Sequence, residues 1–188
     1  MEDLLKLLNR DKPVPAELLL FFIKNMKRIE VKKKDLLLEI GQVSGKVYFI
    51  EKGLFRGYVV DRGSVYSIWF MKEGDLMFGV NSFYTQTPSE EGIEALEDCI
   101  VYGLDYKDLM WAYENYMSFN FNGRKLTEDY YMKTWPDMKG LRKVTATERL
   151  RHFEKTHPEL VNRIPLNHMA SFLGITAETL SRIRRGKK

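Results

Sequence analysis

The spacing of hydrophobic residues changes along the chain and predicts regions of different structure. In residues 2–9 and 15–28, apolar side chains recur every three or four positions, which predicts two short helices. From about residue 29 to residue 105, short β-branched and aromatic runs alternate with glycines, which predicts strands joined by tight turns. Residues 106–134 contain no proline and return to helical spacing. The expected fold is therefore α+β.

The predicted helix over residues 106–134 has more large apolar side chains than one buried stripe needs. A helix that packs on its own strands on one side and on a second copy of the chain on the other would use such a surface. A single helix in an ordinary core fits the periodicity equally well. Trp135-Pro136 and Gly140 interrupt the pattern and predict a linker, after which residues 145–155 restart a helix.

The segment LNHMASFLGITAETLSRI, residues 166–183, has the spacing of a helix-turn-helix. Ala170 is the small residue where two helices would touch, Gly174 lies at the turn, and Thr176 can cap the second helix. A shared core would come from Met169, Leu173, Ile175, Leu180 and Ile183. An ordinary helical hairpin is the alternative. It is disfavoured because the outer side of the second helix carries polar and basic side chains that suit bases and phosphates.

The distribution of charge also changes along the chain, close to the predicted linker. Residues 139–188 hold 12 basic and 4 acidic side chains, a net charge of +8, whereas residues 1–138 hold 18 and 22, a net charge of −4. The basic C-terminal segment is therefore expected to bind a polyanion, and the acidic N-terminal part to have a different function.

Strands, a long helix and a C-terminal helix-turn-helix, in this order, resemble the Crp/Fnr family of bacterial transcription regulators. The resemblance implies an N-terminal β-roll like a cyclic nucleotide-binding domain over residues 1–114. It further implies a central dimerisation helix and hinge over 115–138 and a winged-helix-type DNA-binding domain over 139–188. Residues 159–165 are few for the family's β-hairpin wing, so a reduced wing is expected.

The family's recognition helix commonly carries E-x-x-S-R, which Glu178, Ser181 and Arg182 match. The resemblance implies that these three side chains read bases, and a carboxylate and a guanidinium suit cytosine and guanine edges. The residues expected to contact the DNA backbone are Thr176, Thr179, Lys143, Arg184, Arg185, Lys187 and Lys188. The implied partners are double-stranded DNA with a near-palindromic site, a second copy of the chain, and RNA polymerase as a further candidate.

The family's nucleotide site pairs a glutamate with the ribose and an arginine with the phosphate. With Gly74-Asp75 and Phe83 in register, Gly79 stands in place of the glutamate and Ser89 in place of the arginine. Because the phosphate would lose its guanidinium partner, cyclic AMP is not the expected effector. Another small molecule could occupy a pocket of Trp69, Phe70, Phe78, Gly79, Phe83 and Ser89. The aromatic members of this set also fit an ordinary core.

Enzyme and metal sites find little support in the sequence. The three histidines, His152, His157 and His168, lie outside the strand region, and a single cysteine, Cys99, cannot assemble a cluster. No hydrolase, phosphate-loop or dinucleotide fingerprint occurs. The chain is expected to have no catalytic residue, metal or cofactor, no membrane span and a cytoplasmic location. The alternative to a DNA-binding regulator is a small-molecule sensor or scaffold whose helix-turn-helix contacts protein.

Overall fold

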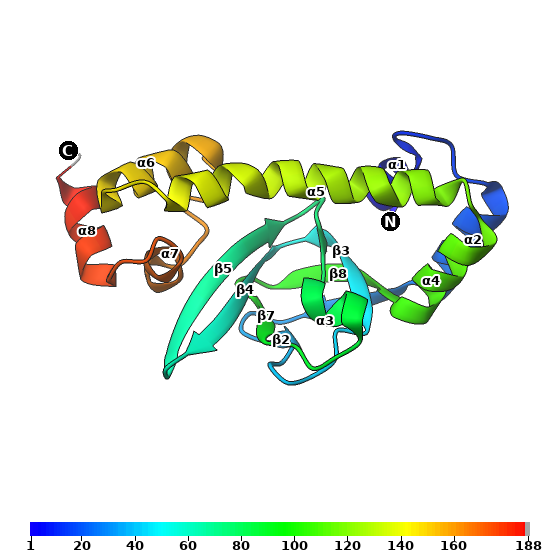
Figure 1. Cartoon of the computed structure of the whole chain (residues 1–188), viewed down its shortest axis with the longest axis horizontal. Helices are drawn as coiled ribbons and strands as arrows, with labels where there is room; N and C mark the ends of the chain where they lie inside the picture. Colours follow the sequence, from blue (N-terminus) through cyan, green and yellow to red (C-terminus); the bar gives the residue numbers. More distant parts are fainter. Residues whose placement is uncertain (187–188) are drawn as a thin grey trace.

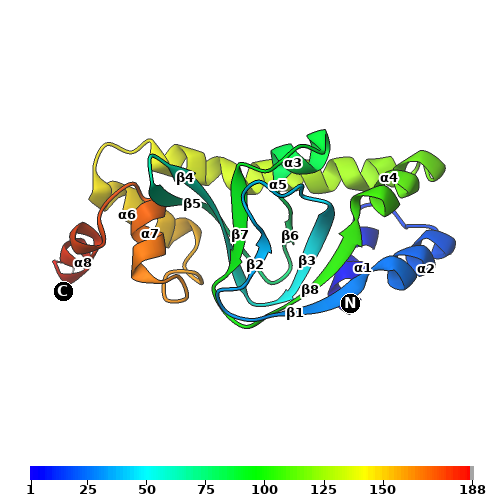
Figure 2. The same ribbon diagram turned by 90° about the horizontal axis from the view of Figure 1, so that it is seen from below.

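The computed structural model describes residues 1–186 and has a β-roll of two four-stranded antiparallel sheets at its centre (Figures 1 and 2). The first sheet has the order β1 (Lys27–Val31), β8 (Cys99–Asp105), β3 (Lys46–Lys52) and β6 (Leu76–Met77). The second has the order β2 (Leu36–Leu38), β7 (Glu91–Ala95), β4 (Leu54–Asp61) and β5 (Ser64–Lys72). The predicted strand region is therefore confirmed as a sandwich.

Buried side chains from both sheets fill the roll. Ile50, Phe55, Ile93 and Val101 have no exposed surface. The β4–β5 hairpin has a two-residue turn at Arg62-Gly63, where both residues have positive φ, +47° and +78°. This is the turn geometry that matches the right-handed twist of two paired strands.

Helices cover one end of the roll. The two predicted N-terminal helices are α1 (Glu2–Asn9) and α2 (Ala16–Asn25), which pack with α4 (Tyr106–Asn115) and bury Leu4, Leu18 and Phe22. A short helix that the sequence analysis did not predict, α3 (Val80–Thr85), follows β6. Its six residues were too few to give a periodic pattern.

The prediction of one helix over 106–134 followed by a linker was right about where the helix begins, but wrong about its continuity and about the linker. The helix is broken at residues 116–118, where Tyr116 leaves helical geometry, and α5 (Phe119–Leu141) then runs through Pro136. A proline inside a helix normally costs stability because it removes a backbone N–H. Here the Pro136 carbonyl accepts a hydrogen bond from the His152 ring at 2.8 Å, so packing on the next helix supports the continued helix.

Three helices complete the chain: α6 (Ala146–Thr156), α7 (Leu166–Phe172) and α8 (Ala177–Arg185). Between α6 and α7, residues 157–165 form turns without a strand, so the reduced wing is a turn segment that buries Leu160 and Ile164. The core of this unit is continuous with the roll, because Leu54, Phe70 and Leu96 belong to the same buried cluster. No helix within residues 1–186 is long and apolar enough to cross a membrane.

Candidate nucleic-acid interface and ligand cavity

The turn between α7 and α8 has the geometry that the sequence predicted. Gly174 has φ +65°, a conformation that favours glycine, and the Ile175 N–H donates to the Ala170 carbonyl at 3.0 Å. Thr176 is the N-cap of α8, and its hydroxyl oxygen accepts from the Thr179 N–H at 3.1 Å. The turn therefore fixes where α8 begins.

The first two turns of α8 present the predicted base-reading side chains to solvent. Glu178 and Arg182 are exposed and stand four residues apart, so they share one face of the helix, while Ser181 is half-buried beside them. Neither Glu178 nor Arg182 forms an ion pair with another residue in the part of the chain described. On the opposite side, Leu180 is fully buried against α7.

The predicted phosphate-contacting residues lie around this face. Lys143 is exposed immediately before α6, and Arg185 is exposed at the end of α8. Thr179 is half-buried in the first turn, and Arg184 is half-buried with Nη2 3.5 Å from the Val161 carbonyl. Lys187 and Lys188 lie outside the described residues.

The helix-turn-helix is held against the roll in this structure. Arg163 reaches two carboxylates of the roll: Nη2 lies 3.0 Å from Glu73 and 2.8 Å from Glu97. The hydrogen bonds that Arg163 donates to Glu97 are the main reason that the pKa of Arg163 is raised. The Ser171 hydroxyl of α7 accepts from the Ser67 N–H of β5 at 3.1 Å. Figure 2 shows α7 lying beneath the β4–β5 hairpin.

Two of the three histidines tie α6 to the end of α5. His152 bonds to the Pro136 carbonyl, and the His157 ring lies 2.7 Å from the Asp137 carboxylate. Gly140 makes this approach possible, because a Cβ there would lie 2.2 Å from the His152 ring. These histidines therefore join helices.

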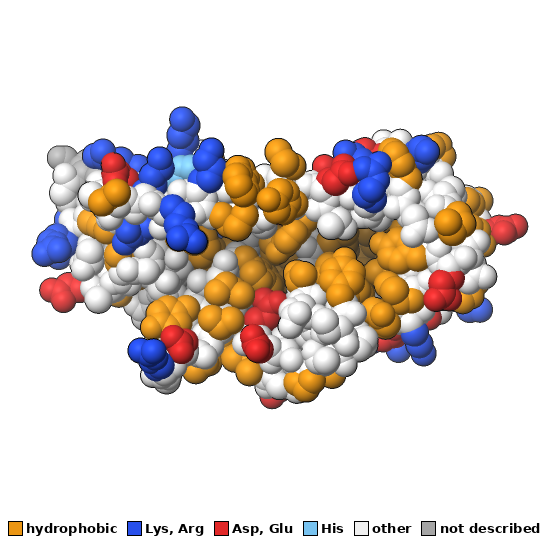
Figure 3. All heavy atoms as spheres, in the orientation of Figure 1, with side chains coloured by type: hydrophobic (Ala, Val, Ile, Leu, Met, Phe, Trp, Pro, Cys, Tyr) orange, Lys and Arg blue, Asp and Glu red, His pale blue; other side chains and the backbone are white. Residues whose placement is uncertain are grey.

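The residues predicted to form one effector pocket lie in three separate parts of the structure. Trp69, Phe78 and Phe83 line a cavity of about 140 Å³ between the roll and α5. Phe70 does not line this cavity, because it packs on Phe153 and Phe172 in the core of the helix-turn-helix. Figure 3 shows the surface hollowed, with an apolar floor, between α5 and the α3 side of the roll.

Gly79 and Ser89 form the third place, outside the cavity. They lie side by side: a Cβ on Gly79 would be 3.2 Å from the Ser89 hydroxyl and 2.8 Å from Leu38. Ser89 is buried, and its hydroxyl donates to the Glu91 carbonyl at 2.8 Å. A longer side chain at residue 79 therefore has no room.

A carboxylate occupies one backbone hydrogen-bond donor at the start of α3. Glu91 accepts from the Val80 N–H at 3.0 Å and from the Trp69 indole at 2.9 Å. Burial is the main cause of its raised pKa. The Val80 N–H at the start of α3 is therefore used internally and does not face a bound anion.

The sequence and the structure resemble proteins of known fold. Residues 28–116 match the model of the cyclic nucleotide-binding domain. FixK2 from Bradyrhizobium japonicum aligns with a TM-score of 0.73 at 18% identity, over 86% of this chain and 83% of that one. A putative transcriptional regulator of the Crp/Fnr family from Eubacterium rectale aligns with a TM-score of 0.72 at 17% identity, over 92% and 83%. The chain has the Crp/Fnr regulator fold.

A third structure with this fold is the c-di-GMP-responsive global regulator CLP from Xanthomonas campestris. It aligns with a TM-score of 0.71 at 14% identity, over 92% of this chain and 91% of that one. No match was found among curated proteins. The predicted resemblance to Crp/Fnr regulators is thus confirmed at the level of the fold.

Within this Crp/Fnr fold, several residues of the site have no signature in the sequence. Glu91 and Arg163 look like ordinary surface charges in the sequence, and their contacts join segments 11 to 90 residues apart. Tyr113 and Tyr130, which line the cavity, are among the large side chains of the helix predicted over residues 106–134, and nothing in that pattern assigned them to a site. No local pattern marks such residues, because the fold brings them together.

Proposed function

We propose that the chain is a cytoplasmic, sequence-specific DNA-binding transcription regulator that acts as a homodimer. The observation that carries this proposal is the exposure of Glu178 and Arg182 on the first turns of a capped helix in a helix-turn-helix. In this motif the N-terminal residues of the second helix meet base edges in the major groove. A guanidinium can bond to guanine O6 and N7, and a carboxylate can accept from the cytosine amino group.

The charge around α8 supports DNA as the partner. Residues 139–188 carry a net charge of +8, and Lys143 and Arg185 are exposed. We assign to them, and to Thr176, Thr179 and Arg184, contacts with phosphates that set the affinity and its salt dependence. A surface that binds protein would have no need for this excess of positive charge.

A stripe on α5 supports the homodimer. Tyr131, Met132, Trp135 and Met138 have 55%, 66%, 45% and 46% of their surface exposed. Tyr131, Trp135 and Met138 follow the i, i+4, i+7 spacing of a helix-pairing seam. Figure 3 shows apolar side chains gathered above α5. We propose that the same stripe of a second copy covers it, which would place two α8 helices in successive major grooves roughly 34 Å apart.

Cyclic AMP is not the effector that we propose. The position of the family's phosphate-binding arginine holds the buried hydroxyl of Ser89, and the carboxylate of Glu91 accepts from the Val80 N–H, next to Gly79. A phosphate diester placed here would meet a negative charge in place of a guanidinium, which disfavours binding.

Selection of bound sequences from a random duplex DNA pool tests the function. We expect an enriched inverted repeat bound by a dimer, with base preference lost in Glu178→Ala and Arg182→Ala. Arg28→Ala, which removes a positive charge on β1, is the matched control and should enrich the same sequence as the wild type. A folded protein that enriches no sequence at any salt concentration would contradict the proposal and favour a sensor or scaffold that contacts protein.

A further inference from the structure

The cavity between the roll and α5 has a mostly apolar lining. Leu4 comes from α1, Met77 and Phe83 from the β6–α3 region, Leu104 from β8 and Leu126 from α5. None of the described residues that line it is charged. An ionised ligand would have to give up its hydration here without a counter-charge, which costs several kcal/mol. The lining therefore selects neutral molecules.

The size of the cavity limits the ligand further. Its volume is about 140 Å³. An engineered cavity of about 150 Å³ lined by Leu, Ile and Phe stays dry and binds benzene. The cavity of this chain thus fits one aromatic ring and is much too small for a complete nucleotide. Tyr84, 56% exposed at the rim, marks a route of entry from solvent.

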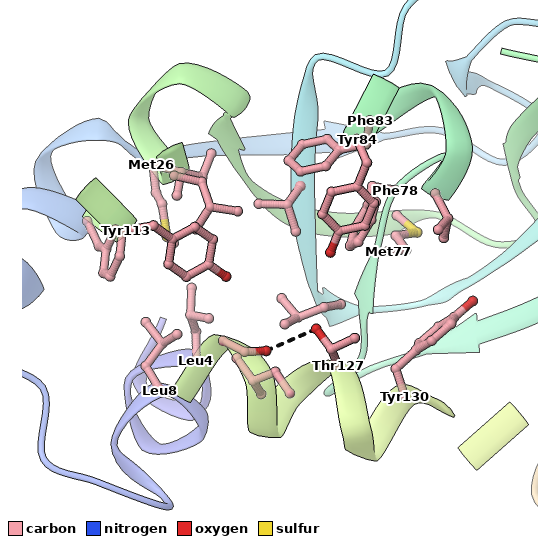
Figure 4. Close-up of a pocket in the computed structure, with 18 of the residues that line it drawn as sticks. Leu4, Leu8, Met26, Met77, Phe78, Phe83, Tyr84, Tyr113, Thr127 and Tyr130 are labelled. Carbon is pink, nitrogen blue, oxygen red and sulfur yellow. Dashed lines mark hydrogen bonds between the residues drawn. The ribbon is translucent and has the colours of Figure 1, made fainter. Parts of the chain in front are cut away.

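Tyr84, Tyr113 and Tyr130 line the cavity, and their hydroxyls make no hydrogen bond within the described residues. The Tyr113 hydroxyl makes no hydrogen bond within residues 1–186, whereas the Thr127 hydroxyl donates to the Gly123 carbonyl at 3.0 Å. Burial raises the pKa of Tyr113 to about 12, so the phenol is a protonated donor at neutral pH. Figure 4 shows this hydroxyl turned toward the open centre of the cavity.

Gly123 keeps the Tyr113 hydroxyl uncovered. A Cβ at this position of α5 would lie 2.4 Å from the hydroxyl oxygen. A hydrogen-bond donor that lies in an apolar cavity without a partner destabilises the empty protein. A ligand that supplies an acceptor removes this cost, which favours binding. The arrangement thus combines an apolar space for a ring with the donor of Tyr113 on one wall.

We propose that this cavity binds a neutral, single-ring aromatic molecule with one hydrogen-bond acceptor. The ring of the ligand lies among the apolar side chains, and its acceptor atom accepts a hydrogen bond from the Tyr113 hydroxyl. That this molecule acts as the effector of a regulator rests on the proposed function. That it binds in the cavity does not.

Calorimetric titration of the full chain, without DNA, tests the ligand class. Acetophenone and ethylbenzene have nearly the same shape and differ in the acceptor, while benzoate adds a charge. We expect acetophenone to bind roughly fivefold more tightly than ethylbenzene, as one hydrogen bond provides, and more tightly than benzoate or cyclic AMP. Tighter binding of benzoate or cyclic AMP than of acetophenone would overturn the proposal.

Two pairs of variants locate the binding. Tyr113→Phe should remove the preference for acetophenone, whereas Tyr66→Phe, at an exposed tyrosine of β5, should keep it. Leu126→Phe should fill the cavity and weaken both ligands at least tenfold, whereas Leu20→Phe, at an exposed position of α2, should not. Unfolding curves show whether Leu126→Phe folds, and Leu109→Phe, on another wall, replaces it if it does not.

Equal affinities of the two neutral ligands for the wild type, or unchanged binding by the folded filling variant, would contradict the site. Because these titrations contain no DNA, their failure leaves the DNA result untouched, and a failure to enrich DNA leaves the ligand result untouched.

Discussion

The carboxylate of Glu91 shows how one side chain changes what the β-roll can bind. It accepts hydrogen bonds from the Val80 N–H and the Trp69 indole, and burial raises its pKa above the ordinary value of 4.5. A carboxyl with a raised pKa favours the folded state most when it is protonated. Its contribution is therefore complete below pH 4.5 and is lost as the pH rises through the higher value in the folded state.

Glu91→Gln removes this titration. We expect the wild type to lose stability relative to Glu91→Gln as the pH rises from 4.5 toward neutrality, because only the wild type must ionise a half-buried carboxyl. Urea unfolding of both proteins across this range measures the difference. Glu90→Gln, at the exposed neighbour, should follow the wild type. A difference that stays constant with pH would show that burial does not control the Glu91 carboxyl.

At the scale of elements, the junction of α5 and α6 decides where the long helix ends. Pro136 and Gly140 predict a linker in the sequence, and the structure has a helix there because the His152 ring fills the space over Gly140. Local propensity was overridden by tertiary packing, which a single sequence does not reveal. The capping residues Thr145 and Thr176, in contrast, act within four residues, and the start of α8 was predicted correctly from its cap.

Gly140→Ala tests this packing. Alanine normally stabilises a helix relative to glycine, but here its Cβ would meet the His152 ring, so we expect a loss of about 1–3 kcal/mol in the free energy of unfolding. The loss should disappear in a His152→Ala background, measured as a double-mutant cycle. Gly45→Ala, where a Cβ meets open space, is the control. An additive cycle would argue against the contact.

Thr176→Ala tests the start of α8. Loss of the hydroxyl that accepts from the Thr179 N–H should lower the free energy of unfolding by about 1 kcal/mol. Thr147→Ala, within α6, is the matched control and should leave stability nearly unchanged. Equal effects of the two substitutions in thermal unfolding would mean that the cap does not stabilise α8.

At the scale of the whole molecule, the helix-turn-helix and the roll share one buried cluster of apolar side chains. Arg163, just before α7, also forms ion pairs with Glu73 and Glu97 of the roll. The order of strands, long helix and helix-turn-helix could be predicted because each part has its own period and turn residues. The docking of α7 on β5 could not, since Ser67 and Ser171 are 104 residues apart and neither has a local signature. Phe70 was assigned to a pocket for the same reason, because alternation along a strand does not say which neighbour covers each face.

Arg163→Ala should loosen this docking. We expect faster hydrogen exchange of backbone amides in α6–α8 and in β5, with the other strands of the roll unchanged, because two ion pairs across the contact are lost. Arg151→Ala, at an exposed position of α6, should leave exchange as in the wild type. Unchanged exchange in Arg163→Ala would show that the apolar cluster alone holds the two parts together.

The most direct measurement of the central claim compares affinities for the selected duplex and for a scrambled duplex by fluorescence anisotropy at one salt concentration. Arg182→Ala should lose about 1–3 kcal/mol on the selected duplex alone, because it removes a base contact. Lys143→Ala should weaken both duplexes alike, because phosphates are the same in each. Equal losses on both duplexes for Arg182→Ala would contradict base reading by α8.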